Sequence, residues 1–247
     1  MFESAKQKID RANYHIADLI RQTAAFIAEK PHRFVIESDP ITGALLVKIK
    51  FLKEPPVTLA LVIADAIHNL RTALDHIAWE LAAIGNGTQD RHTSFPTGDN
   101  RINFESRCNG IVTPSQWVKD AFKSLEAFPG GKGHELYNLS ELDNADKHTV
   151  ITPVMRATGH PPIRASHPQG RLVVMERNTF IGGASEGRTL ASFAPGTKIE
   201  LEDDAECPPS IFFPKPDHTI EPAWSMMRGF AVAVGNALKI IEEAVLT

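Results

Sequence analysis

The chain has 247 residues, of which 43% are hydrophobic and 23% are charged, and its formal net charge is −4. This length and composition fit one globular domain with a real core, and the acidic balance argues against a general nucleic-acid coat. The cysteines, Cys108 and Cys207, are sparse and far apart, which favours a reducing compartment over a disulfide framework. Apolar runs are too short for a membrane span and the N-terminal segment has no signal-peptide core, so we expect a cytoplasmic protein without a membrane partner.

The first part of the chain predicts two long helices on either side of a β-hairpin. Residues 3–29 repeat apolar side chains on one helical face, and Lys30-Pro31 ends the pattern. Two strand-like runs, residues 33–37 and 45–51, flank a turn sequence and predict the hairpin. A second helix opens at Pro55-Pro56 and continues to about Ile84.

The second part of the chain mixes helical and strand-like patterns. Residues 88–113 look like a loop, a short helix follows to about Phe128, and a glycine-rich loop precedes a third main helix over residues 134–147. Strand-like runs occupy residues 171–176, 179–181, 198–202 and 210–213, and a fourth long helix covers residues 222–246.

These elements predict a mainly α fold. We expect a bundle of four long helices, with a β-hairpin after the first helix and a small β-rich insertion before the last. The whole chain would be a single domain, residues 1–247. The bundle would comprise residues 1–150 and 219–247, and the insertion about residues 151–215.

The second helix carries polar residues that are unusual for a face in water. Its apolar stripe is Ile63, Ile67, Leu70, Leu74, Ile77 and Leu81. The opposite side carries Asp65, His68, Asn69, Arg71, Thr72, Asp75, His76 and Trp79. A helix face exposed to water usually carries Lys, Glu and Gln, because those side chains can stay mobile there at little cost in free energy. The pattern therefore predicts a hydrogen-bonded site that another part of the chain covers.

A second polar segment lies at the C-terminal end of the third main helix. It contains Asp143, Asn144, Asp146, Lys147 and His148. Capping and the helix dipole explain such residues at a helix end on their own. Two helices that both present Asp, Asn and His can also satisfy each other across a cleft, so we expect one shared site.

The spacing of Arg71 and His76 is R-x4-H, and in this the chain resembles the HEPN (higher eukaryote and prokaryote nucleotide-binding) superfamily of all-α domains. The resemblance implies a metal-independent ribonuclease or an RNA- or nucleotide-phosphate-binding protein that forms a homodimer and needs no cofactor. His76 would be the acid/base and Arg71 would hold the phosphate. Supporting or binding positions would be His68, Asn69, Asp75, Asn144, Asp146, Lys147 and His148.

A longer pattern carries a second resemblance. The order of His68–Trp79, then Phe95-Pro96, then Leu142–His148 is similar to that in a group of uncharacterised bacterial proteins. This resemblance implies that both polar segments belong to one functional unit. It implies no particular activity.

Two alternatives stay open beside the ribonuclease. A metal-dependent hydrolase would use carboxylate and imidazole ligands from both segments, namely Asp65, His68, Asp75, His76, Asp143 and His148. A non-enzymatic module would use the same network only to fix the register of its helices. The enzyme hypothesis requires that Arg71 and His76 open onto a cleft.

Overall fold

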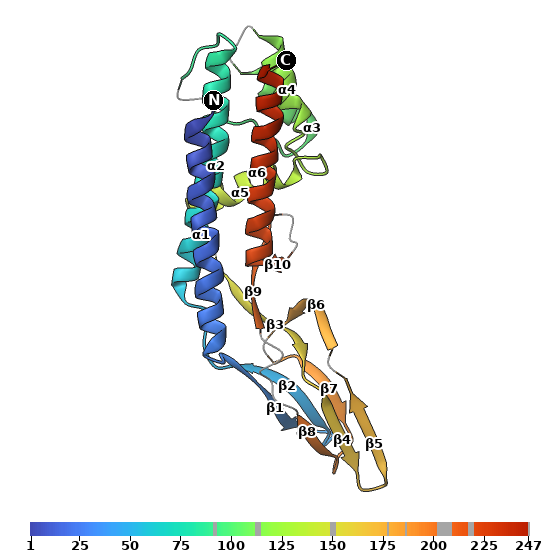
Figure 1. Cartoon of the computed structure of the whole chain (residues 1–247). Helices are drawn as coiled ribbons and strands as arrows, with labels where there is room; N and C mark the ends of the chain where they lie inside the picture. Colours follow the sequence, from blue (N-terminus) through green and yellow to red (C-terminus); the bar gives the residue numbers. More distant parts are fainter. Residues whose placement is uncertain are drawn as a thin grey trace.

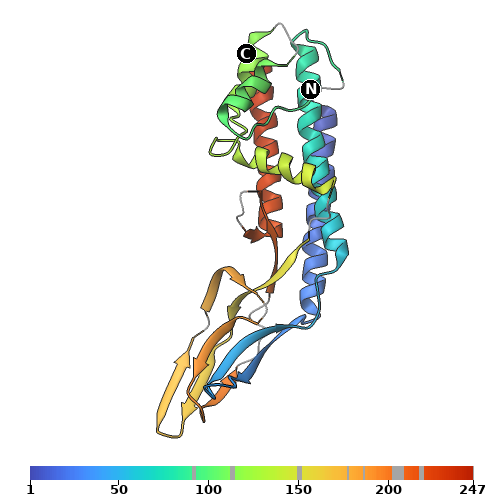
Figure 2. The same ribbon diagram turned by 180° about the vertical axis from the view of Figure 1, so that it is seen from behind.

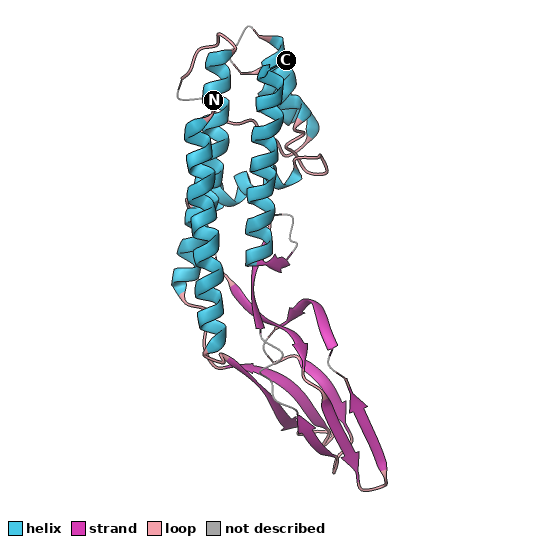
Figure 3. Cartoon of the chain, in the orientation of Figure 1, coloured by secondary structure: helices cyan, strands magenta, loops and turns pink. Residues whose placement is uncertain are grey.

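The computed structural model describes residues 1–90, 93–111, 115–148, 152–176, 178–185, 187–201, 209–216 and 220–246. The molecule is elongated, with its helices at one end and its sheets at the other (Figures 1 and 3). Both chain ends lie at the helical end, far from the sheets (Figure 1).

Three long helices form the body of the helical end. They are α1 (Glu3–Ala28), α2 (Val57–Ile84) and α6 (Ala223–Leu246), and they pack side by side along their length (Figure 1). Each repeats apolar residues three or four positions apart, so each presents one face to a common core. Leu19, Ile67 and Phe230 are examples from the three helices, and all are buried there.

Helix α2 is the most apolar of the described helices. By length and composition it is the one described helix that is long and apolar enough to cross a membrane. The central helix of a packed core passes the same test, since it too is surrounded by apolar groups. In this structure α2 packs against α1, α5 and α6.

Three shorter helices pack beside the long ones. They are α3 (Arg101–Asn109), α4 (Gln116–Ser124) and α5 (His134–Asp146). Asn100 caps α3, because its side chain accepts a hydrogen bond of 2.9 Å from the backbone N–H of Asn103. Helix α5 crosses α2 and α6 instead of running along them (Figure 2).

The described strands form three antiparallel sheets. The strands are β1 (His32–Ser38), β2 (Leu45–Phe51), β3 (Val154–His160), β4 (Ile163–His167), β5 (Arg171–Met175), β6 (Asn178–Ala184), β7 (Thr189–Phe193), β8 (Lys198–Leu201), β9 (Pro209–Pro214) and β10 (Ile220–Pro222). The strand orders are β1-β2-β7, β10-β9-β3-β6 and β5-β4-β8. Strand β10 leads directly into α6, so the last strands connect the sheets to the helical end.

The prediction of a mainly α bundle of four long helices is wrong, because the fold is mixed α and β. The predicted fourth member, α5, has 13 residues and lies across the bundle. The predicted hairpin is present as β1 and β2, but it forms part of a larger sheet. A two-stranded ribbon leaves unpaired backbone groups at its edges, and β7 pairs with β2 there, with Val47 opposite Ala191.

The predicted loop over residues 88–113 is also partly wrong, because α3 lies within it. This helix is short and mostly polar, and Phe104 and Cys108 are its buried residues. Two buried positions in nine residues give too weak a periodicity to identify a helix from the sequence.

Candidate functional site

The polar face of α2 meets α5 through two neighbouring contacts. The Nδ1 atom of His68 lies 3.0 Å from Oδ1 of Asp143, and Arg71 donates a hydrogen bond of 3.2 Å to the Ser140 hydroxyl. The two α2 residues are three positions apart, and so are the two α5 residues. One turn of each helix therefore faces one turn of the other.

Arg71 is held in place by groups from three parts of the chain. It forms an ion pair of 2.9 Å with Asp75, and it donates to the Phe95 carbonyl oxygen as well as to Ser140. The same Asp75 oxygen accepts a bond of 2.9 Å from the Phe95 backbone N–H. Since a guanidinium has five N–H donors, about two remain available after these three contacts.

Arg71 lines a cavity of about 320 Å³, which we call the arginine cavity. Its wall consists of Arg71, Ala78, Asp90, Thr93, Ser94, Phe95, Pro96, Thr97, Arg107, Gly110, Ile111, Ser140 and Asn144. Arg107, from the last turn of α3, brings a second guanidinium. In the described part of the chain Arg107 has no carboxylate within ion-pair distance, and Asp90 is the one acidic residue of the wall.

His76 lies in a neighbouring cavity of about 410 Å³, which we call the histidine cavity. Asp75, Trp79 and Thr93 also line it, and Trp79 is 44% exposed. The Nδ1 atom of His76 is buried and has no hydrogen-bond partner among the described residues. Arg71 and His76 therefore both open onto cavities, but onto two cavities whose linings share Thr93.

The Asp143 carboxylate is buried between an imidazole and an ammonium group. The residue is 3% exposed, and while Oδ1 faces His68, Oδ2 lies 2.7 Å from the Lys147 ammonium. One turn further, Asp146 is partly buried. Burial and the charge of Asp143 raise the pKa of Asp146 above its usual range, although His68 acts in the opposite direction.

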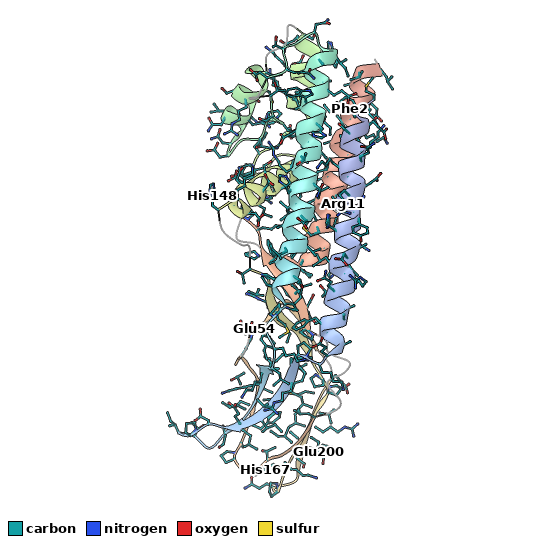
Figure 4. The ribbon with its side chains drawn as sticks, turned by 90° about the vertical axis from the view of Figure 1, so that its left-hand side faces the viewer. Phe2, Arg11, Glu54, His148, His167 and Glu200 are labelled. Carbon is teal, nitrogen blue, oxygen red and sulfur yellow. The ribbon has the colours of Figure 1, made fainter. Side chains whose placement is uncertain are left out.

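The remaining predicted residues lie in different places. Asn69 faces α1, since it donates to the Asp65 carbonyl at 2.7 Å and accepts from Lys8 at 3.4 Å. Asn144 lines the arginine cavity. His148 follows the end of α5 at the outer edge of the helical end (Figure 4).

The alternative metal ligands are not brought together. Asp65 lies near His15 of α1, at 4.0 Å, whereas Asp75 pairs with Arg71 and Asp143 pairs with His68. Within the described ranges, no three His, Cys, Asp or Glu side chains are grouped as a metal site. The ligand set proposed from the sequence therefore does not form one coordination sphere in this structure.

Sequence reasoning missed two contributors to the site. Ser140 lies on the predicted third main helix, and its hydroxyl positions Arg71. Arg107 lies in the segment predicted as a loop. The sequence signal that could have found Arg107 is the N-cap residue Asn100. This cap indicates the start of a helix, and a helix gives the Arg107 side chain a defined direction.

Comparisons of this chain with protein-family models, with curated proteins and with solved structures found no match.

Proposed function

We propose that the arginine cavity binds the phosphate group of a nucleotide or of RNA. The observation that carries this proposal is Arg107, a guanidinium that lines a cavity and has no ion-pair partner among the described residues. Arg107 is exposed at the last turn of α3, so its charge is solvated while the cavity is empty and an anion can reach it. A bound anion would provide the missing partner.

The rest of the wall suits a phosphate. Arg71 faces the same cavity and is already fixed by its contacts, so little side-chain entropy is lost when a ligand binds. Guanidinium groups present paired donors that match phosphate oxygens. Hydroxyl and amide groups complete the wall, from Thr93, Ser94, Thr97, Ser140 and Asn144.

The charge of the cavity differs from that of the whole chain. The net charge is −4, but among the described residues the wall carries two guanidinium groups and one carboxylate, and Asp75 pairs with the guanidinium of Arg71. We therefore expect one or two phosphate contacts rather than a long track along RNA. The affinity should therefore fall only gently with salt. The slope of log affinity against log salt concentration should have a magnitude of about one to two.

The test is a calorimetric titration of the full chain with adenosine 5′-monophosphate and with a single-stranded RNA 12-mer. Arg107→Gln should weaken both at least about tenfold, since a hydrogen bond to a charged group is worth about 1.5–3 kcal/mol. Arg101→Gln is the matched control. It removes the same charge from the same helix, but Arg101 points to Glu105 and Glu126 and does not line the cavity.

Adenosine without its phosphate should not compete with the monophosphate. The proposal is wrong if neither probe binds, or if Arg107→Gln and Arg101→Gln bind both probes as tightly as the unaltered chain.

A further inference from the structure

Helix α1 leaves part of its apolar surface uncovered near the sheets. The helix continues past the beginning of α6 toward the sheets (Figures 1 and 2). Ile16 is buried in the core, but further along the helix Ile20 and Ile27 are only partly buried. Ala24 and Ala28, which lie beside them, are exposed. The last turns of α1 therefore present apolar side chains that the described helices cover only in part.

These side chains line a cavity of about 580 Å³, which we call the junction groove. It lies where α1 meets the beginning of β9, through Pro209 and Ser210, and the first turns of α6, through Trp224 and Arg228. Its volume exceeds those of the arginine and histidine cavities. A cavity of this size that combines an apolar lining with a few polar groups is typical of sites for small molecules.

The polar groups of the junction groove favour an anion. The guanidinium of Arg228 lies 5.8 Å from the ring centroid of Trp224, and the Trp224 side chain is 45% exposed. In the described part of the chain Arg228 has no carboxylate within ion-pair distance, and the described lining contains no acidic residue. Thr23 and Ser210 add two hydroxyl groups. The groove therefore offers one unpaired positive charge and hydroxyl donors beside an apolar surface.

From this arrangement we infer that the junction groove binds a fatty acid, that is, a free carboxylic acid with an unbranched alkyl chain. One guanidinium matches the single charge of a carboxylate, whereas a phosphate monoester carries a charge of about −1.5 to −2. The alkyl chain would lie along α1. Ile20 and Ala28 are eight positions apart, which is about 12 Å of helix, close to the extended length of a chain of about ten carbons.

The inference does not depend on the proposed phosphate binding, because none of the residues that line the junction groove lines the arginine cavity. Adenosine 5′-monophosphate should therefore bind equally well in the presence and absence of a fatty acid. Failure of the Arg107 titration would leave the junction groove untouched, and the reverse also holds.

The first test is a calorimetric titration of the full chain with decanoate below its micelle concentration. One decanoate should bind per chain. Octanoate should bind at least about fivefold more weakly, since each methylene group that leaves water strengthens binding about fourfold when it is fully buried.

The head group is tested by a pair of arginine variants. Arg228→Gln should weaken decanoate binding at least about tenfold and leave the binding of 1-decanol unchanged, because the alcohol has no charge to pair. Arg11→Gln is the matched control. Arg11 also lies over an aromatic ring, 4.9 Å from the centroid of Tyr14, but it does not line the groove.

The location is tested by filling the groove. Ala24→Phe should abolish decanoate binding, because the added ring occupies the space of the alkyl chain. Ala25→Phe is its control, since Ala25 is the next exposed residue of α1 and does not line the groove. Decanoate should also change the tryptophan fluorescence of the full chain, and Trp224→Phe should remove this change.

Three results would overturn the inference. The first is the absence of decanoate binding, and the second is binding of several decanoate molecules per chain that Ala24→Phe leaves unchanged. The third is a dimer in light scattering that Ala24→Phe dissociates and decanoate does not, since the groove would then be an interface between copies of the chain.

Discussion

At the scale of single residues, Arg71 and His76 are five positions apart, and helix geometry sets the directions in which their side chains point. Five residues turn a helix by about 500°, so the two side chains point about 140° apart. A helical wheel still counts both as opposite the apolar stripe. The Arg71–Asp75 ion pair and the Phe95 segment then divide that side into two cavities. The sequence could predict the polar face, but not this division, because the covering segment is remote in sequence.

Burial also determines the chemistry of a single thiol. Cys108 is fully buried in α3, and burial raises the pKa of its thiol to about 12. Because the thiolate is the reactive form, folded Cys207→Ser protein should react with a disulfide reagent at least about 100-fold more slowly than the same protein in denaturant. Rapid labelling of the folded protein would show that Cys108 is accessible.

At the scale of elements, the helices with a strong apolar period were the easiest to predict. The predicted range 3–29 corresponds to α1, and 222–246 corresponds to α6. Strands β3, β4, β7 and β10 had no prediction, because short strands with small or polar residues have little periodicity. Their identity depends on partners elsewhere in the chain.

The loop before α5 depends on a glycine that has no room for a side chain. A Cβ on Gly133 would lie 2.4 Å from the Leu125 carbonyl oxygen. Gly133→Ala should therefore destabilise the protein by about 2 kcal/mol in denaturant unfolding, since the backbone must shift. Gly229→Ala on α6 is the control: its Cβ meets nothing within 4 Å, and alanine should stabilise the helix by about 1 kcal/mol. Equal effects of the two substitutions would contradict this packing.

At the scale of the whole molecule, a buried lysine ties the sheets to the helical end. Lys215 follows β9 and is 7% exposed. Its ammonium lies 2.9 Å from Glu135 of α5 and 3.3 Å from Glu221 of β10. Burial acts to lower the pKa of Lys215, but the hydrogen bond and the charge of Glu135, together with Glu221, outweigh it and raise the pKa.

Lys215→Met should lower the free energy of unfolding at pH 7 by about 2 kcal/mol, because two carboxylates lose the cation between them. The folded pKa is raised, so the contribution is fully present below 10.5 and is lost as pH rises through the folded pKa. The difference in thermal unfolding between the two proteins should therefore begin to shrink above about pH 10.5 and vanish only above the folded pKa of Lys215. Lys198→Met serves as the comparison, since Lys198 and Glu200 form an exposed pair and should change stability little. A similar loss in both variants would show that Lys215 has no special role.

The homodimer suggested by the resemblance to the HEPN superfamily remains a prediction. Light scattering of the full chain measures it directly, and a cavity completed across a two-fold axis would change which residues face the phosphate.

Local periodicity and turn chemistry were enough to predict the long helices, the hairpin and the unusual polar face of α2. The folded structure was needed to show that β7 joins the hairpin, that α5 crosses α2, and that Arg107 and Arg71 line one cavity. Those features depend on contacts between segments far apart in the chain. No local pattern encodes them, since strand pairing and cavity formation are set by which distant surfaces bury each other.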